Sequence, residues 1–430
     1  MITLKSYKFT EEGRRVDYDY EATGKASKFL NPREPFFVRY DFDVSKCPPG
    51  IIIIPFISNF ITLAWFGGFN IRVPEVDAIF AKSLLEVRAE FERLHHGYSL
   101  TGSLYSKQET EHNWTGGKAL MLFSGGMDAY TGLIRHQDED IELITILGAD
   151  IDLSDSVQWQ QCLNHIKTEP FSSKFTHQTI TANMRKFYND NVEVNLVFGW
   201  WGKVQHGLGL LGLLAPISFE RKASIAYISS TYSIPITWGS TKVSDEKIRW
   251  GGLRVLHDAA ELTRQNKAQL IVDFARARQK PIQLRICYSE VKRDGNCGKC
   301  EKCYRTIMNL VLAGADPRDY GFPFSRKTYE NMFRYISSIP ASAGMKIFWL
   351  EISNAAHASL NTKNFFVLSD YKEEFSIITR IANGEINRTL ERNYRPWYQR
   401  WIRFKFILRV RFPAFYNIGR GLVRQLRRFK

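Results

Sequence analysis

The chain has 430 residues, more than a single hydrophobic core normally serves, so two or three domains are expected. Its 44% hydrophobic, 24% charged and 14% aromatic residues are typical of a globular protein and argue against long disordered stretches. The net charge of +15 is concentrated at one end, because residues 388–430 hold eleven arginines, two lysines and one glutamate, a net of +12. A near-neutral body with a basic tail is therefore expected.

The first region, residues 1–115, is predicted to be a mixed α/β domain. Residues 1–17 are charged and lack an apolar stretch, so no secretory signal is expected and a reducing cytoplasm is the expected setting. Strands are predicted at 36–42, 50–55 and 61–66, and a helix at 74–95. A glycine-containing break near residue 115 marks the predicted domain boundary.

One long uncharged run, residues 50–71, is long enough to span a bilayer. It follows two prolines and contains Pro55, Gly67 and Gly68. These residues favour a buried strand at 51–54, a turn and a second strand over a transmembrane helix. A second run, residues 204–219, is too short to span a bilayer and is predicted to be a buried helix.

Residues 116–325 are predicted to form the central domain, because strand-like and helical segments alternate from Lys118 onward. Strands are predicted at 119–123, 141–147, 195–198, 224–229 and 236–239, and helices at 127–136, 157–166 and up to residue 214. This alternation predicts an α/β fold with a doubly wound parallel sheet, in which ligands bind at the carboxyl ends of the strands. A mostly helical region, 326–387, and the basic tail, 388–430, follow.

The strongest local signal is a strand followed by the loop Ser124-Gly125-Gly126-Met127-Asp128 and then a helix. The glycines permit a tight turn and a close approach of the backbone to a ligand. The start of the helix presents free N–H groups and the positive end of its dipole, which suit phosphate. The loop lacks the lysine and the spacing of the G-x-x-x-x-G-K-[ST] motif. A glycine-rich turn without a ligand remains the alternative interpretation.

Four of the six cysteines have the spacing C-x9-C-x2-C-x2-C, within a segment predicted to form a knot at 285–305. They are Cys287, Cys297, Cys300 and Cys303. In a reducing compartment, clustered cysteines bind metal more often than they form disulfides, and four thiolates suit a tetrahedral structural zinc ion. An iron–sulfur cluster, disulfides and unpaired thiols remain alternatives.

Together the two motifs resemble the PP-loop ATP pyrophosphatase superfamily. The loop is similar to the S-G-G-x-D-[ST] sequence of that superfamily, and the cysteines resemble those of the 7-cyano-7-deazaguanine synthases of the queuosine pathway. The resemblance covers roughly residues 118–312. It implies an enzyme that cleaves ATP between the α and β phosphates, adenylates a carboxylate or carbonyl, and transfers nitrogen to it. ATP, Mg²⁺ and Zn²⁺ are the cofactors that the resemblance implies.

The resemblance also implies roles for individual residues. The residues implied to bind ATP are Ser124, Gly125, Gly126, Met127, Asp128 and Gly148. Ser240 follows a predicted strand at the same edge of the sheet and is a further candidate for ATP binding, although a plain turn explains it at least as well. Ser124 and Asp128 are the implied catalytic residues, Asp128 by positioning the phosphates or Mg²⁺. Ala129 departs from the family, which usually has serine or threonine there, and the usual P-G-R-N substrate segment is not found. The chain is therefore expected to be a divergent relative with a different substrate, either a small molecule or a protein terminus.

Other polar residues near the predicted strand ends are weaker candidates. Asp150 and Asp152 follow the second strand, where relatives bind nucleotide, although capping of the next helix explains them as well. Arg254 could hold an anion and His257 or Asp258 could transfer a proton, but helix capping and surface salt bridges are favoured. No partner spacing that indicates a metal site accompanies His95, His96 or His206.

The tail interleaves arginine with aromatic residues between Arg395 and Phe406. Such a mixture binds RNA through phosphates and base stacking, lies on the anionic inner face of a membrane, or docks on an acidic partner protein. RNA and a membrane surface are equally favoured by the sequence, and a homodimer is also compatible with it.

Two other functions stay open at this point. A tRNA-modifying, thiolase-like enzyme of the same superfamily needs a reactive cysteine, either Cys162 or one of the four in the knot. A nucleotide-binding module without turnover is compatible with Ala129.

Overall fold

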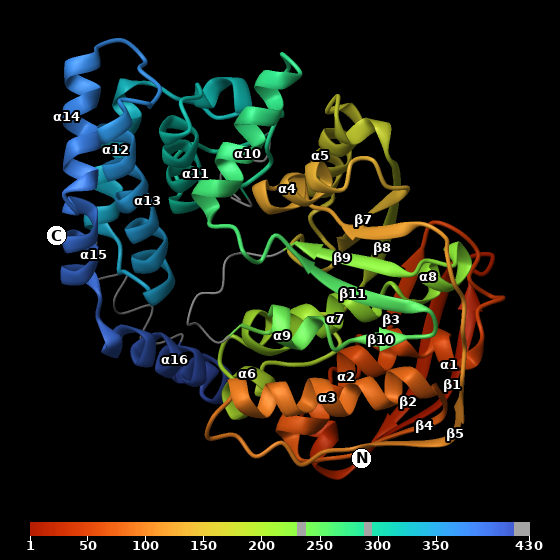
Figure 1. Cartoon of the computed structure of the whole chain (residues 1–430). Helices are drawn as coiled ribbons and strands as arrows, with labels where there is room; N and C mark the ends of the chain where they lie inside the picture. The colour runs from red at the N-terminus through yellow and green to blue at the C-terminus, as the bar shows by residue number, and fades with distance from the viewer. Residues whose placement is uncertain (230–237, 288–294, 417–430) are drawn as a thin grey trace.

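The computed structural model describes residues 1–229, 238–287 and 295–416. The strands of this part of the chain are β1 (Ile2–Thr10), β2 (Arg15–Ala22), β3 (Phe37–Tyr40), β4 (Ile71–Asp77), β5 (Leu104–Thr110), β6 (Ala119–Leu122), β7 (Ile141–Leu147), β8 (Thr176–Ala182), β9 (Ile225–Ser229), β10 (Arg249–Trp250) and β11 (Leu253–Asp258). They form one mostly parallel sheet, in the order β10-β11-β9-β6-β7-β8-β3-β2-β1-β4-β5 (Figure 1).

The centre of the sheet is a block of five parallel strands, β11, β9, β6, β7 and β8. From β6 the chain moves outward to β7 and β8, and then returns to add β9 and β11 on the other side of β6. In open α/β sheets, ligands bind outside the carboxyl ends of the strands at the point where the strand order reverses. The predicted α/β class is confirmed, and the carboxyl ends of β6 and β9 are where a ligand site is expected.

Hydrophobic cores cover both faces of this block. Leu120 and Ala226 belong to one core, whereas their neighbours Met121 and Tyr227 belong to the other, as the two-residue period of a strand requires. The first core includes residues of α2 (Ile54–Gly67), α7 (His206–Gly212) and α8 (Ala215–Arg221). The second includes residues of α4 (Met127–Arg135), α5 (Ser156–Thr168), α10 (Arg264–Ala277) and α11 (Glu301–Leu312). Helices therefore cover both faces of the central block.

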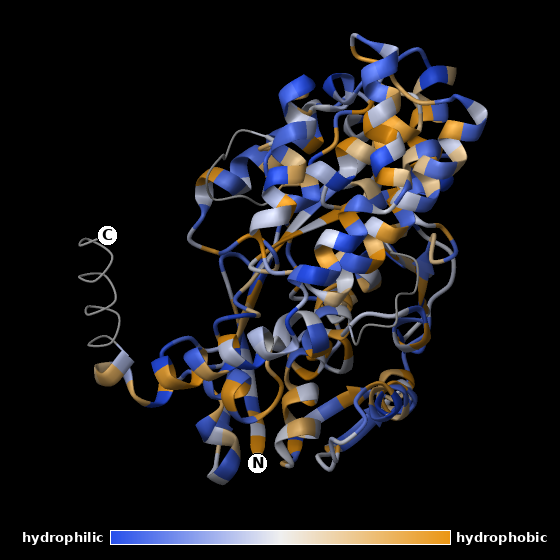
Figure 2. Ribbon diagram, turned by 90° about the vertical axis from the view of Figure 1, so that its left-hand side faces the viewer, coloured by the Kyte–Doolittle hydropathy of each residue, from blue (hydrophilic) through white to orange (hydrophobic). Residues whose placement is uncertain are grey.

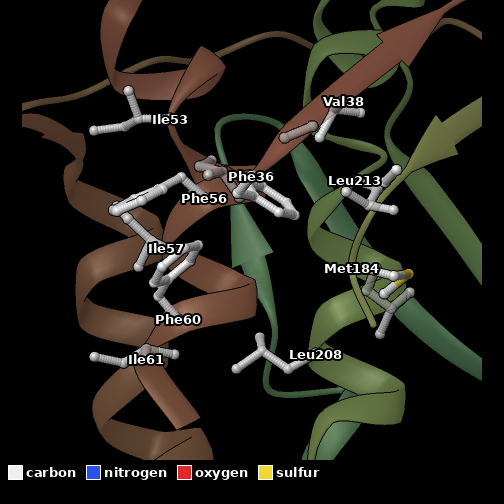
Figure 3. Packing of buried hydrophobic residues seen from close by; sticks show 14 of the residues in the cluster. Phe36, Val38, Ile53, Phe56, Ile57, Phe60, Ile61, Met184, Leu208 and Leu213 are labelled. Atoms are coloured by element: carbon white, nitrogen blue, oxygen red, sulfur yellow. The ribbon is translucent and has the colours of Figure 1, made fainter. Parts of the chain in front are cut away.

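The uncharged run at 50–71 is helical over most of its length, so the prediction of strands at 50–55 and 61–66 was wrong. Its residues form α1 (Pro49–Ile52), α2, and only at the end the first residue of β4. Pro49 and Pro55 lie in the first turns of the two helices, where a missing N–H costs nothing, and Gly68 ends α2 at φ +65°. Figure 3 shows Phe56 and Phe60 of α2 packed beside Phe36 in the core. Among the described residues, no helix combines the length and the apolar character needed to cross a bilayer.

The strands of residues 1–115 are continuous with the parallel block. Val38 of β3 pairs with Ala182 of β8 in antiparallel register, so main-chain hydrogen bonds join the two predicted regions. The helix predicted at 74–95 is α3 (Ala78–Leu94), preceded by β4. The described residues also include short helices: η1 (Gly24–Lys28), η2 (Ser172–Lys174), α6 (Asn191–Asn195), the π-helix η3 (Trp201–Gln205), α9 (Lys242–Asp245) and η4 (Pro317–Tyr320).

Two further predicted strands, 195–198 and 236–239, are not found as strands among the described residues. The segment 195–198 is not a strand, because Glu193 of α6 accepts hydrogen bonds from the backbone N–H groups of Gly199 and Trp200 and turns the chain into η3. The strand predicted at 236–239 begins outside the described residues, and Trp238 and Gly239 are in irregular structure. Strands β1, β2, β4, β5, β8, β10 and β11 were not predicted, although Leu253–Asp258 alternates buried and exposed positions at its start.

The region after residue 325 is helical, as predicted, and the helix-forming residues extend into the basic tail. The helices are α12 (Arg326–Ser338), α13 (Ala343–Thr362), α14 (Tyr371–Ala382), α15 (Glu385–Asn393) and α16 (Pro396–Arg411). The first four form a layer on one side of the sheet, and α16 runs from them back to α6 (Figure 1). Hydrophilic and hydrophobic residues are mixed along α16 (Figure 2).

Candidate functional site

The predicted phosphate loop, residues 124–128, connects β6 to α4. Gly125 has φ +75°, in the left-handed region that favours glycine, and an added Cβ would lie 2.9 Å from Cδ2 of His165. The carbonyl of Gly125 accepts a hydrogen bond from the backbone N–H of Arg285 at 2.7 Å. Gly126 is the N-cap of α4, so the first turn of that helix presents its N–H groups at the loop. The backbone therefore has the form that suits an anion at the carboxyl end of β6.

A cavity of about 1040 Å³ opens beside this loop. Ser124, Gly126, Met127 and Asp128 line it, together with residues at the carboxyl ends of β7 and β9. Its other walls come from α11, from the start of α13 and from α16. The volume lies just above the range typical of ligand sites, about 300–1,000 Å³, so the cavity has room for a large ligand.

The lining of the cavity is strongly basic. Two acidic side chains, Asp128 and Asp150, line it, against eight basic ones. The basic residues are Lys203, Lys242, Arg264, Arg285, Lys302, Arg305, Arg400 and Arg403. A cleft lined by one sign of charge between low-dielectric walls concentrates ions of the opposite sign. The cavity is therefore suited to an anionic ligand.

Asp128 pairs with two basic residues of α10. Its Oδ1 lies 2.7 Å from Nζ of Lys267, and its Oδ2 lies 3.0 Å from Nη2 of Arg264. The side chain of Lys267 is 0% exposed and that of Asp128 is 24% exposed. Residues three apart on a helix share a face, so α10 directs both cations at the loop. Asp128 thus holds a pair of positive charges beside the predicted phosphate site.

Arg305 of α11 is buried against the ring of Phe348, with its guanidinium carbon 4.0 Å from the ring centre. Burial lowers the pKa of Arg305 to about 10, with the charge of Glu301 opposing the shift, so the side chain stays charged at neutral pH. Its Nε lies 2.9 Å from Oε1 of Glu301 in an ion pair, but neither Nε nor Nη1 has a hydrogen-bond partner among the described residues. Because an unpaired buried nitrogen is costly, an anionic group in the cavity is a fitting partner for Arg305.

The other predicted nucleotide residues have different positions. Ser240 lines the cavity, and its Oγ donates a hydrogen bond to Oδ2 of Asp245 at 2.5 Å. Asp150 lines the cavity and accepts a hydrogen bond from the indole of Trp201 at 3.3 Å. Gly148 has a backbone role, because an added Cβ would lie 1.8 Å from the carbonyl oxygen of Ala182.

The remaining candidates divide between the cavity and ion pairs elsewhere. Asp152 pairs with Lys186 at 2.7 Å, and the hydrogen bond from that lysine lowers its pKa. Asp258 lies 3.1 Å from both Arg135 and His136. The hydrogen bond between Asp258 and His136 raises the pKa of His136. The raised pKa favours the charged histidine, and therefore an ion pair with Asp258 over proton transfer. His257 lines the cavity, whereas Arg254, near the start of β11, is exposed and does not line it.

Two histidines form a polar part of the cavity wall. Neither ring nitrogen of buried His257 has a hydrogen-bond partner among the described residues, although Nε2 lies 3.4 Å from Oδ2 of Asp245. Burial lowers the pKa of His206, and its Nδ1 also lacks a described partner. The ring of His206 lies 5.1 Å from that of Trp201 and 5.7 Å from that of Trp238. This wall can exchange hydrogen bonds with a ligand.

The four cysteines form one compact group. Their sulfur atoms all lie within 4.8 Å of one another, with 3.8 Å between Cys287 and Cys300 and 3.7 Å between Cys297 and Cys303. A tetrahedral ion with bonds to sulfur of about 2.3 Å separates its ligands by about 3.8 Å. All four are free cysteines, so no disulfide joins them. The group can therefore hold a metal ion such as zinc.

The cysteine group lies on the same chain segments as three of the basic residues that line the cavity. Arg285 stands two residues before the first cysteine, and Cys300 is the N-cap of α11, which carries Lys302 and Arg305 in its first turns. The side chain of Asn296 accepts hydrogen bonds from two backbone N–H groups of the segment 286–287 and donates one to the carbonyl of residue 284. A metal here would fix three of the eight basic side chains that line the cavity.

Sequence reasoning missed most of the basic residues at the site. Lys267, Arg305, Arg400 and Arg403 lie between 139 and 275 residues from Asp128 along the chain, and only the fold brings their helices to the loop. The sequence signal that could have revealed part of this group was the spacing of Arg264 and Lys267, three residues apart on one helical face.

Comparison with family models, with curated proteins and with solved structures finds no match to this chain.

Proposed function

We propose that this protein binds ATP in the cavity, adenylates a carboxylate or carbonyl group of a second substrate and transfers nitrogen to it. The observation that carries the proposal is the glycine loop at the carboxyl end of β6, which opens into a cavity with eight basic and two acidic lining residues. A helix N-terminus and a surrounding group of cations suit a polyphosphate. The chain is proposed to be a divergent member of the PP-loop ATP pyrophosphatase superfamily.

The proposed reaction has two steps. An oxygen of the substrate attacks the α phosphorus of ATP. The bond between the α phosphorus and the α–β bridging oxygen breaks, and pyrophosphate leaves. An amine or ammonia then attacks the activated carbon, AMP leaves with the bonding electrons, and a proton is lost from nitrogen. Residues 124–126 would hold the departing pyrophosphate through backbone N–H groups, and Arg264 and Arg305 would stabilise the charge that develops on it.

Mg²⁺ would supply further neutralisation of the phosphates when it is bound with ATP. Asp128 and Asp150 are the two carboxylates that line the cavity, so they are the side chains proposed to approach it. Asp128 also holds Arg264 and Lys267, which gives it a role in positioning cations whether or not it contacts the metal. Zinc is the metal proposed for the four cysteines, in a structural role, because all four ligand positions are supplied by thiolates.

The thiolase-like alternative is less well supported. Cys162 lines the cavity, but burial raises the pKa of its thiol, with the charge of Arg285 only partly opposing the shift. A raised pKa disfavours the thiolate that sulfur chemistry requires. The four cysteines of the candidate metal-binding group do not line the cavity.

The test is release of pyrophosphate from ATP by the purified chain, measured across a panel of carboxylic acids with ammonium present. Pyrophosphate and AMP in equal amounts support the proposal, and replacement of Asp128 by alanine should abolish both. ATP binding without turnover across the panel would favour the nucleotide-binding module. Release of ADP and inorganic phosphate would contradict the proposed cleavage between the α and β phosphates.

A further inference from the structure

Helix α16, from the basic tail, is fastened to the body at both ends. Near its start, the backbone N–H of Ala341 donates to the carbonyl of Asn393 at 3.2 Å. Near its end, Arg411 donates to Oδ1 of Asn195 at 2.7 Å, and the ring of Phe406 packs 5.6 Å from that of Phe198. The helix therefore has a defined orientation relative to the α/β body and the helical layer (Figure 1).

Side chains of α16 line the cavity and also lie exposed to solvent. Arg400 and Arg403, three residues apart, both line the cavity. Trp397, Trp401 and Phe404 follow the i, i+4, i+7 spacing of one helical face and are 56%, 42% and 50% exposed, and Arg400 lies at the border of that face. Large aromatic residues gathered on one exposed face of a folded protein mark a site of interaction.

The exposed aromatic face lies within a purely basic stretch. Residues 395–416 contain six arginines and lysines and no acidic residue. Two of these cations flank the aromatic rings, with Nζ of Lys405 4.8 Å from the ring centre of Trp401 and the guanidinium of Arg395 6.0 Å from that of Trp397. The partner of this surface must therefore accept aromatic rings and positive charge together.

We propose that the face formed by Trp397, Trp401 and Phe404 docks on an anionic lipid surface. Tryptophan and phenylalanine rings enter the boundary between headgroups and acyl chains, while flanking cations attract anionic headgroups. Nucleic acid fits this face less well, because the rings of Trp401 and Phe404 stack on each other at 5.9 Å and 21°, which occupies ring faces that bases would need. Docking in this orientation places the cavity, lined by the same helix, next to the lipid surface.

The proposal does not depend on the ATP chemistry and is tested separately from it. The full chain is mixed with vesicles of phosphatidylcholine alone or with added phosphatidylglycerol, and bound protein is measured by flotation. We expect binding to the anionic vesicles that weakens with salt, and little binding to the neutral ones. The variant W397S/W401S/F404S should bind at least about tenfold more weakly, equivalent to about 1.4 kcal/mol or more.

A matched control comes from α14, where Tyr371 and Phe375 are also exposed aromatic residues. The variant Y371S/F375S should bind vesicles like the parent chain, and thermal melting verifies that both variants are folded. Failure of the parent chain to bind anionic vesicles would overturn the proposal, as would unchanged binding by W397S/W401S/F404S or an equal loss in the α14 control. Binding of a tRNA that depends on the same three residues, without vesicle binding, would assign the face to RNA and also overturn it.

Discussion

The ion pair between Asp128 and Lys267 offers the sharpest test of the site, through the substitution Asp128→Ala. It removes the carboxylate that lies 2.7 Å from a fully buried ammonium group and 3.0 Å from Arg264. We expect two separable consequences: the free energy of unfolding should fall because a buried charge loses an ion-pair partner, and the proposed reaction should stop because the cations beside the glycine loop lose the carboxylate that positions them.

The stability loss can be bounded from the geometry. Breaking a buried ion pair by removing one partner costs about 3–5 kcal/mol. The carboxylate is 24% exposed, so water reaches it, and we expect the lower end of that range, about 3 kcal/mol. Its second pair, with Arg264, is also partly exposed and contributes about 1 kcal/mol or less.

The double variant D128A/K267M separates the two consequences. Methionine replaces the buried ammonium with an apolar side chain of similar length, so urea unfolding should recover to within about 1 kcal/mol of the parent chain. Pyrophosphate release should nevertheless stay absent in both variants. If D128A unfolds at the same urea concentration as the parent chain, or if the double variant recovers no stability, the buried ion pair does not have the role assigned to it.

Three further outcomes follow from the described geometry. Cys300→Ser, or treatment with a strong chelator, should remove one equivalent of bound metal, as measured by elemental analysis. Either change should also weaken ATP binding about tenfold or more, because the metal no longer fixes the start of α11 and its basic side chains. Burial lowers the pKa of His165 and His177 to about 4 from the ordinary 6.5. The unfolded chain therefore binds more protons in this interval, and stability present above pH 6.5 should be lost as the pH falls toward 4, a slope that His165→Gln should flatten in a series of thermal melts. Gly148→Ala should cost about 3 kcal/mol or more in urea unfolding, because its φ is +97° and the new Cβ would meet a carbonyl oxygen at 1.8 Å.

These outcomes have matched controls. Cys47→Ser changes a buried cysteine outside the metal-binding group and should leave the metal content unchanged. His136→Gln removes a histidine whose pKa is raised by Asp258, so it should not flatten the acid slope. Gly24→Ala has a similar positive φ of +60° but no atom within 4 Å of the new Cβ, so only the backbone strain of about 1 kcal/mol is expected. Equal losses in Gly148→Ala and Gly24→Ala would contradict the steric argument.

The sequence by itself determined the local features that carry their own signal. The apolar run 119–122 followed by two glycines and a helical pattern gave β6, the loop and α4, and 141–147 was predicted with the bounds of β7. The cysteine spacing predicted a four-ligand group because C-x-x-C turns bring thiols together without help from distant residues. Each of these features depends on contacts within about twenty residues or fewer of chain.

Other features lay beyond local reasoning. A run of apolar residues such as 51–66 has no period to distinguish a strand from a helix, and it became helical because it is buried on all sides against the sheet and α7. No helix was predicted in the basic tail, whereas α16 packs on α6 and supplies Arg400 and Arg403 to the cavity.

The loop of residues 124–128 was therefore visible in the sequence, but its surroundings were not. Lys267, Arg305 and Arg403 approach it from α10, α11 and α16, and no local pattern encodes which distant helices pack together. Tertiary structure alone decided that these positive charges converge, because the burial of apolar helix faces fixes where the charged residues on the same helices must lie.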